Sequence, residues 1–500
     1  MESGNSSDAP VGLRPTPLSW RLLLAAGVVV LGGAAVVLDP LVGPRGRALL
    51  GALAFIVLTA VFSSNLRAVN WRTVATGIGL QVLLVLFVLQ LGFRRDTTPE
   101  MTRQFYLAQA VISLGQGGGG ALAVGPVATL EAPETYLWRP GYLLFDTVGR
   151  AVKKFLDFSD AGSRFVFGAL ADPDTLGKAL PGRGFVFAFS ALPTIIFVSS
   201  FFTVLYYFGV LQLVVRLFAR GMMYLMGTSG AETLSAAANV FMGQTEAPLI
   251  VKPYVPLMTR SELLALMVGG MATISGGVMA VYINLGADPV AILATSVMAA
   301  PCGLYLSKLL LPEEEEPLTR GQVQVVDTAP HSNVIDAASA GASDGLQLAL
   351  NIAAMLIAFL ALLAMIDHLL KLVHPALGLQ SLFGALFAPV AYLMGVERAD
   401  LWQVGDLLGT KLVANEFVAY VKLTTDYRST LSPRSYVLAT FALTGFANFA
   451  SIGIQLGGIG AMAPTRRADL AQLGPRALLA GFLATLVNAC LAGVLLDPGE

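Results

Sequence analysis

The run MATISGGVMAVYINLG, residues 271–286, is apolar apart from a few small polar residues and is interrupted by Gly276 and Gly277. A second run, GFANFASIGIQLGGIG, residues 445–460, is interrupted by glycine in the same manner. About thirty residues before each run lies a carboxylate, Glu246 in GQTEAPLIVKPY and Glu416 in ANEFVAYVKL. Paired apolar segments that glycine interrupts at matching places are typical of secondary transporters built from inverted repeats.

The composition places this pattern in a membrane. Of 500 residues, 55% are hydrophobic and only 13% are charged, with a mean hydropathy of +0.72. Soluble domains carry charge on roughly 25% of their residues, and a spanning helix needs roughly 20 mostly apolar residues, which this chain supplies many times. We therefore expect an all-α, polytopic integral membrane protein. A net charge of -1 gives no polycation that would attract nucleic acid.

The hydropathy pattern divides the first part of the chain into segments. We expect a disordered tail at residues 1–18 and three spanning helices within residues 19–93. An insertion of unknown role follows at 94–140, and an amphipathic helix in the membrane interface at 141–160. The first repeat follows at 161–311, with a re-entrant hairpin around 231–258 and a broken helix at 263–287. Arginines flank all three early helices, so the charge bias does not fix the orientation.

The second part follows a similar plan after an acidic aqueous loop. The expected segments are this loop, a long spanning region and a second repeat, at residues 312–335, 336–396 and 397–500. Within the second repeat we expect a re-entrant hairpin around 400–432, a broken helix at 435–463 and a last spanning helix at 477–496.

Glu246 and Glu416 would be energetically unfavourable if they lay deep in the membrane. Each would cost about 2.5–3.5 kcal/mol there, which is tolerated where the carboxylate faces a partner or a watery cavity. Gly243 and Pro248 interrupt the first stretch and predict a hairpin, whereas the second hairpin is predicted from the matching plan alone. The alternative is a purely structural role. Each glutamate would then lie at a helix end and reach the interface, and the glycine pairs would allow close helix packing.

The broken runs also carry neutral polar side chains, namely Thr273, Ser275, Asn448, Ser451 and Gln455. Carbonyl, hydroxyl and amide oxygens suit a sodium ion, and together with carboxylates they can bind a neutral polyhydroxylated solute. An intramembrane hydrolase using Ser229 and His368 is the enzyme alternative. Ser229 fits better as a helix cap, and His368 fits an interfacial position, so we do not expect an enzyme.

At these motifs the chain strongly resembles the concentrative nucleoside transporters. The segments that carry the resemblance are SSNLRAVNWR (63–72), SRFVFG (163–168), FAFSALPTIIFVSSFFTVLYYFGVLQ (187–212), ANVFMGQTEAPLIVKPY (238–254), MATISGGVMAVYI (271–283), AASAGASDGLQLALNIAAMLIAF (337–359), NEFVAY (415–420) and GFANFASIGIQLGGIG (445–460). The resemblance leaves out the N-terminal tail, the 94–140 stretch and the acidic loop. The 94–140 stretch is longer than the short link usual in the family.

The resemblance implies a homotrimer in which a transport domain (161–311 and 397–500) moves against a scaffold (19–93 and 336–396) to give alternating access. It implies a nucleoside site in which Gln244 and Glu246 face the base, Thr245 lies at the same hairpin tip, and Phe446 packs the base. Glu416, Asn448 and Ser451 face the ribose.

For the coupling ion, the resemblance implies a sodium site made by the Asn239 side chain, the Met242 carbonyl, Thr273 and the Ile274 carbonyl. Thr273 stands where the family pattern has serine and keeps the hydroxyl. We expect a sodium-coupled nucleoside symporter in a bacterial plasma (inner) membrane, in contact with lipid. A proton-coupled symporter and a transporter of another polar solute with the same architecture remain open, and the sequence does not distinguish pyrimidine from purine nucleosides.

Overall fold

The computed structural model describes residues 15–91, 93–96, 135–172, 175, 186–190, 192–321, 331–375 and 378–496. This part of the chain is helical apart from one antiparallel pair of short strands, β1 (Phe93–Asp96) and β2 (Thr135–Trp138). Residues 1–14 of the predicted tail, 97–134 of the predicted insertion and 322–330 of the predicted acidic loop lie outside the described residues. The strands thus pair near the two ends of the 94–140 stretch.

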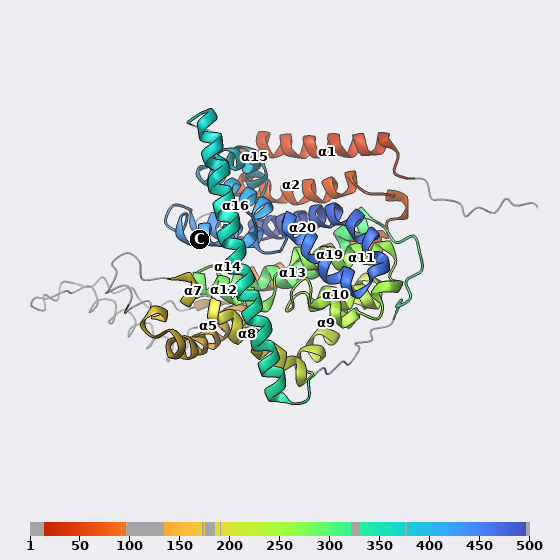
Figure 1. Ribbon diagram of the computed structural model, residues 1–500. Coiled ribbons are helices and arrows are strands. Elements are labelled where there is room, and N and C mark those ends of the chain that lie inside the picture. The colour runs from red at the N-terminus through yellow and green to blue at the C-terminus, as the bar shows by residue number, and fades with distance from the viewer. Residues whose placement is uncertain are drawn as a thin grey trace, which may run out of the picture.

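Three long helices stand where the sequence predicts them in 19–93, namely α1 (Leu18–Val37), α2 (Asp39–Val61) and α3 (Trp71–Leu89). In Figure 1, α1 and α2 run side by side at one edge of the molecule. Asn70 caps the start of α3, because its side chain accepts a hydrogen bond from the Arg72 N–H. The amphipathic helix predicted at 141–160 is α5 (Pro140–Phe167), which continues one to two turns further than expected.

A sharp bend divides the long uncharged run near residues 185–215. The run contains α7 (Phe187–Ser190) and α8 (Leu192–Tyr207). The next helix, α9 (Val210–Met226), leaves α8 at an angle of 75°. Gly209 stands at the bend with a φ of 74°, a left-handed conformation that favours glycine. The hydropathy pattern of this run does not predict the bend.

The first predicted hairpin and broken helix form a continuous series of short elements. These are α10 (Gly230–Ala238), the 3₁₀ turns η3 (Ala247–Val251) and η4 (Val255–Leu257), α11 (Arg260–Ala272) and α12 (Gly276–Leu285), followed by α13 (Pro289–Leu310). The break predicted within 263–287 falls between α11 and α12. It is stabilised by Ser275, whose side chain accepts a hydrogen bond from the Val278 N–H and so begins α12.

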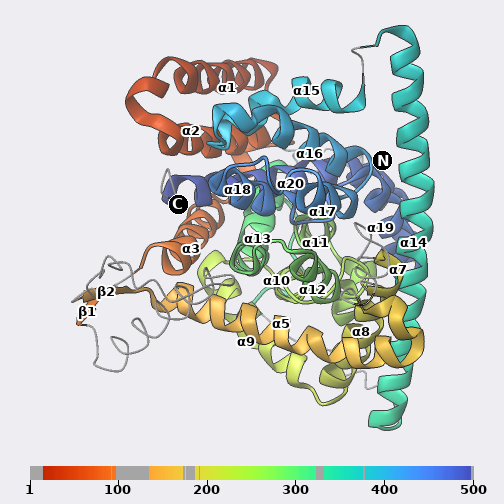
Figure 2. The ribbon, with the colours of Figure 1, turned by 90° about the vertical axis from the view of Figure 1, so that its left-hand side faces the viewer.

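The region 336–396 contains α14 (Val334–Val373) and α15 (Leu379–Leu393). With 40 residues, α14 is the long helix that runs along one side of the molecule in Figure 2. It packs closely on α8 at Gly345, where an added Cβ would lie 2.7 Å from the Ile196 Cα. The small residue therefore allows the two helix backbones to approach each other.

The second predicted hairpin and broken helix consist of α16 (Leu401–Val413), α17 (Glu416–Thr425), α18 (Pro433–Leu443) and α19 (Phe449–Met462). The break predicted within 435–463 falls between α18 and α19. The last helix, α20 (Arg467–Leu495), begins ten residues earlier than predicted. Breaks in the backbone therefore occur in both halves of the chain.

The centre of the molecule is made of α11 with α12, α13 and α20. The most apolar windows of these spans are 94%, 89% and 78% buried, compared with 6% for α1. By length and composition, six helices in the described part of the chain can cross a membrane, or seven if α8 and α9 form one bent span. The expected all-helical polytopic membrane fold is therefore confirmed.

The described part of the acidic loop is attached to the helices at its start. Glu313 accepts hydrogen bonds from Lys308 Nζ at 3.0 Å and from Thr259 Oγ1 at 2.9 Å, and Glu314 accepts one from Asn65 Nδ2 at 2.8 Å. Glu315, in contrast, is exposed. The expectation of a solvated loop thus fits Glu315, whereas Glu313 and Glu314 are bonded to the helices.

Candidate transport site

The loop after α10 carries the first group of predicted residues. It is closed by its own carboxylate, because the Gly243 N–H donates to Glu246 Oε2 at 2.9 Å. The Gly276 N–H donates to the Phe241 carbonyl at 2.9 Å, which attaches the loop to the break between α11 and α12. The loop tip and the broken helix of the first half are thus one structural unit.

The second group is assembled around Glu416, the first residue of α17. Asn415 caps this helix by accepting a hydrogen bond from the Val418 N–H at 2.9 Å. Glu416 Oε2 accepts a hydrogen bond from Asn448 Nδ2 at 2.9 Å, and its Oε1 accepts one from the Tyr282 hydroxyl at 3.2 Å. The carboxylate therefore joins α17 to the start of α19 and to α12.

All seven predicted substrate residues line one cavity of about 520 Å³. They are Gln244, Thr245, Glu246, Glu416, Phe446, Asn448 and Ser451. Leu348, Asn351 and Ala354 of α14 line the same cavity. Small-molecule sites have volumes of roughly 300–1,000 Å³ and combine an apolar lining with a few convergent polar groups. The cavity has this character, with carboxylate, amide and hydroxyl groups beside the Phe446 ring.

The four predicted sodium residues lie beside this cavity, where the end of α10 meets the break after α11. Asn239 is fully buried, and its Oδ1 has no hydrogen-bond partner in the described structure. An added Cβ at Gly269 would lie 3.0 Å from Asn239 Nδ2, and the Gly269 carbonyl accepts a hydrogen bond from Thr273 Oγ1 at 2.8 Å. Buried acceptors usually have a partner, so the free Asn239 oxygen fits a cation ligand.

The other two sodium candidates follow directly on these residues. Met242 is at the loop tip and lines a neighbouring cavity together with Glu246 and Ser275. Ile274 is buried in the break itself, and the carbonyl of the preceding Thr273 accepts a hydrogen bond from the Phe446 N–H at 3.1 Å. This last bond connects the candidate sodium residues of the first half to Phe446, which lines the cavity from the second half.

Comparison with known proteins identifies the family. Models described as Na+ dependent nucleoside transporter N-terminus, Nucleoside recognition and Na+ dependent nucleoside transporter C-terminus match residues 50–117, 188–289 and 291–493. The chain is 39% identical to an uncharacterized transporter of Haemophilus influenzae, over 90% of this chain and 98% of that protein. It is 40% identical to sodium/nucleoside cotransporter 1 of Mus musculus, over 90% of this chain and 63% of the mouse protein.

The chain belongs to the concentrative, Na+-dependent nucleoside transporter family. Among solved structures, CNTnw in an inward-facing substrate-bound state is 36% identical, with a TM-score of 0.75 over 90% of this chain and 97% of that one. A CNTnw variant in an outward-facing state gives a TM-score of 0.77 at 36% identity, over 90% and 98% of the two chains. The predicted family is therefore confirmed, as is the prediction of a transporter instead of an enzyme. This chain spans about 63% of the length of the mouse relative.

Two further buried residues, which do not line the cavity, lie near Glu416 and were not selected from the sequence. Tyr282 bonds Glu416 and stacks on Tyr420 with ring centroids 4.1 Å apart. Lys411 is fully buried and donates to the Ala442 carbonyl at 2.8 Å. A lysine in the mainly apolar stretch before Glu416 is a signal that the sequence did contain, whereas no local pattern points to Tyr282.

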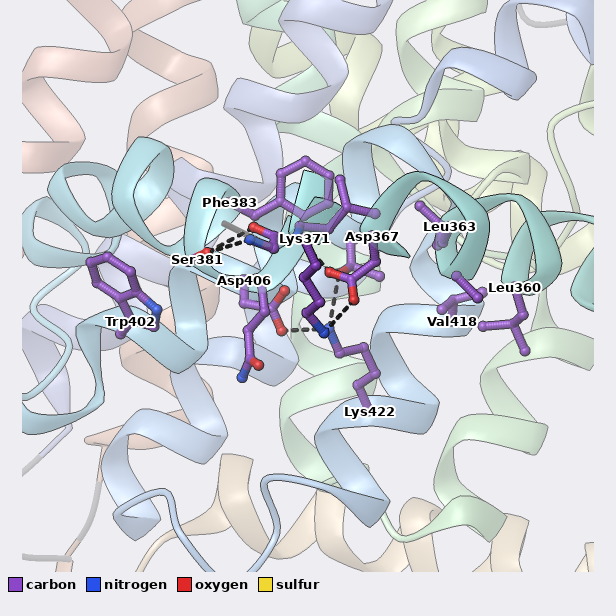
Figure 3. Close-up of a pocket in the computed structure, with 15 residues that line it drawn as sticks. Leu360, Leu363, Asp367, Lys371, Ser381, Phe383, Trp402, Asp406, Val418 and Lys422 are labelled. Atoms are coloured by element: carbon purple, nitrogen blue, oxygen red, sulfur yellow. Dashed lines mark hydrogen bonds and ion pairs between the residues drawn. The ribbon is translucent and has the colours of Figure 1, made fainter. Parts of the chain in front are cut away.

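A second cavity of about 530 Å³ lies between α14, α15, α16 and α17 (Figure 3). None of the predicted site residues lines it. Asp406 of α16 forms an ion pair with Lys422 of α17, and the Tyr427 hydroxyl donates to Asp406 Oδ2 at 2.7 Å. Because Asp406 precedes the break at 414–415 and Lys422 follows it, the pair holds the two arms of this hairpin together.

Proposed function

We propose that this chain is a sodium-coupled nucleoside symporter that works by alternating access. The observation that carries the proposal is the convergence of the seven polar and aromatic residues on one cavity, in a chain of this family. Structures of the related CNTnw include inward-facing and outward-facing states. The same architecture in this chain supports a cycle in which the cavity opens first to one side of the membrane and then to the other.

Within the cavity, Gln244 and Glu246 bind the nucleobase, Thr245 completes the loop tip and Phe446 packs against the base. Glu416, Asn448 and Ser451 bind the ribose. The chemistry supports this division, because the Glu416 carboxylate accepts hydrogen bonds, as ribose hydroxyls require of a partner, and an aromatic ring suits the flat base. Asn448 and Ser451 are tied to Glu416 through the start of α19.

Sodium binds through the Asn239 side chain, Thr273 and the carbonyls of Met242 and Ile274. Sodium is a transported substrate here and supplies the driving force from its gradient. The Gly276–Phe241 backbone bond connects the ion residues to the loop carrying Gln244, so we expect ion binding to order this loop before the nucleoside binds. Proton coupling is the alternative for the same site.

The two halves of the chain act as inverted repeats. Each half contains a helical hairpin, then a broken helix, then a long helix, and this common order supports the proposal. In the first half these are α10–η3, α11–α12 and α13, and in the second half α16–α17, α18–α19 and α20. The hairpins are re-entrant and move with residues 161–311 and 397–500 as the transport domain, while 19–93 and 336–396 form the scaffold. A homotrimer in a bacterial plasma membrane is the expected assembly.

Uptake of labelled uridine into proteoliposomes tests the function. We expect accumulation with an inward sodium gradient at equal pH on both sides, and none with potassium in place of sodium. Uptake that instead follows a pH gradient would replace sodium by protons. The absence of uptake of every nucleoside under both gradients, in protein that is folded and inserted, would refute the function.

Thermal shift separates the nucleoside from other polar solutes. Uridine, cytidine, adenosine and inosine are each added in sodium, and at least one should raise Tm because ligands that bind the native state stabilise it. Sugars, amino acids and dicarboxylates should leave Tm unchanged. Stabilisation by one of these and by no nucleoside would favour the transporter of another solute. Light scattering of the same purified sample measures whether it is a trimer.

A further inference from the structure

Gln455 is a buried amide that lies directly behind the substrate cavity without lining it. It belongs to α19 and is fully buried. Its Nε2 donates to Gln244 Oε1 at 3.2 Å and to the Met267 carbonyl at 3.0 Å. Gln455 therefore contacts the proposed base-binding residue without itself lining the cavity.

The Met267 carbonyl fixes the orientation of both amides. A carbonyl oxygen only accepts hydrogen bonds, so the NH₂ group of Gln455 must face Met267. The second hydrogen of that group is then directed at Gln244, which must present its oxygen. The Gln244 NH₂ group consequently faces the other way, where it donates to Ser451 Oγ at 3.2 Å. One of its two hydrogens is used in this bond, and the other is available to the cavity.

Both amides are packed closely against α11 at Gly270. An added Cβ at Gly270 would lie 2.8 Å from Gln455 Nε2 and 2.8 Å from Gln244 Cβ. The glycine of α11 thus allows the helix to approach both side chains. Gln455 Oε1 has no hydrogen-bond partner in the described structure, which leaves the NH₂ group as the part of this amide that makes its specific contacts.

We propose that Gln455 is a positioning residue that determines which group of the nucleobase Gln244 recognises. It holds the Gln244 amide so that the base meets an N–H donor. The site therefore selects bases that present an acceptor there, a carbonyl oxygen or a ring nitrogen, over bases that present an amino group. This inference rests on the proposed function, in which Gln244 faces the base, and it goes beyond that function in naming the hydrogen-bond polarity of the site.

The variant Gln455→Met tests the inference, because methionine has a similar length and no N–H donor. Without the clamp, Gln244 can rotate and present either its oxygen or its NH₂ group. We measure Kd by calorimetry in saturating sodium for uridine against cytidine and for inosine against adenosine, pairs in which a carbonyl replaces an amino group. The wild type should discriminate at least one pair, and the variant should reduce that discrimination by about fivefold to tenfold, the value of one hydrogen bond.

The control is Gln81→Met, which removes another fully buried glutamine that bonds Asn488 and Tyr305 away from the cavity. It should lower Tm and leave the base ratios unchanged. If Gln455→Met does not fold, Gln455→Asn keeps an amide that is too short to reach both acceptors and should give the same loss of discrimination.

The outcomes separate the two proposals. Wild-type ratios in a folded Gln455 variant that binds nucleosides, or a wild type that discriminates neither pair, would overturn the positioning role alone. A wild type that binds no nucleoside would overturn the proposed function. An equal loss of affinity for all four nucleosides would make Gln455 a merely structural residue and would also overturn the inference.

Discussion

Replacing Glu416 by glutamine removes one charge from the cavity while keeping the shape of the side chain. In the structure Glu416 is 5% exposed and receives hydrogen bonds from Asn448 Nδ2 and from the Tyr282 hydroxyl. A glutamine can still accept from Asn448 through its oxygen. Its NH₂ group can donate to Tyr282, because a hydroxyl both donates and accepts. We therefore expect the Glu416→Gln variant to fold.

The loss of affinity follows from the difference between charged and neutral hydrogen bonds. A bond to a charged group contributes about 1.5–3 kcal/mol and a neutral one about 0.5–1.5 kcal/mol. Losing the charge should thus cost about 1–1.5 kcal/mol for each ribose hydroxyl that Glu416 binds. This corresponds to a Kd that is about fivefold to tenfold higher per hydroxyl. The loss should be similar for purine and pyrimidine nucleosides, since it concerns the ribose.

The assay compares each nucleoside with its 2′,3′-dideoxy analogue, by calorimetry on purified protein in saturating sodium. The variant should weaken the ribonucleoside and leave the dideoxy analogue, which lacks the hydroxyls, nearly unchanged. Glu315→Gln is the matched control, because Glu315 lies exposed in the acidic loop. Equal losses for both ligands, or wild-type affinity for the ribonucleoside, would refute the assignment of Glu416 to the ribose.

Three further changes test other parts of the structure. Asn239→Leu should raise the sodium concentration needed for half-maximal nucleoside binding by about tenfold, the equivalent of about 1.4 kcal/mol for a lost ligand, whereas Thr273→Ser should behave as wild type in the same sodium titration. Gly445→Ala should weaken nucleoside binding and lower Tm, because Gly445 has a φ of 123° and an added Cβ would lie 2.8 Å from a threonine methyl of α20 and 2.9 Å from a carbonyl of α11; unchanged Tm and Kd would contradict this. Asp406→Asn should cost about 1.5–3 kcal/mol of stability, the contribution of a hydrogen bond to a charged group, because the Lys422 side chain is 26% exposed and its charge is not fully buried. Wild-type thermal unfolding would show that the pair does not stabilise the hairpin.

The glycines of the two apolar runs predicted that the helices are interrupted there. Gly445 lies in the break before α19 with a φ of 123°, whereas Gly276 is the first residue of α12 and the break lies just before it, at residues 273–275. The second hairpin break was predicted without such a residue, from the matching plan of the two halves. The structure gives its local reason, since Asn415 caps α17 and ends the loop. An asparagine at this place is a helix-start signal that the sequence analysis passed over.

Other features could not be predicted, because they depend on contacts between distant segments. The run at 185–215 is uncharged throughout, so its hydropathy pattern does not mark the bend, which falls at Gly209, the one glycine of this run. The partners Tyr282 and Glu416 are far apart in the sequence, as are Gln244 and Gln455, and one chain without an alignment offers no covariation to join them. The site residues themselves were named from family motifs, and the structure brings the seven substrate candidates to one cavity.

The structure separates the buried carboxylates into two groups that the sequence does not distinguish. Glu232 forms an ion pair with Lys308 at 2.6 Å, and Asp406 one with Lys422, so these carboxylates are neutralised within the fold. Glu246 and Glu416 take their hydrogen bonds from neutral donors, Gly243, Tyr282 and Asn448, and both line the cavity proposed to bind the nucleoside. A carboxylate that pairs with a lysine has its partner within the fold, whereas Glu246 and Glu416 accept hydrogen bonds from neutral donors and lie where a ligand in the cavity would contact them. The sequence contains both kinds in similar apolar surroundings, and only the pairing distinguishes them.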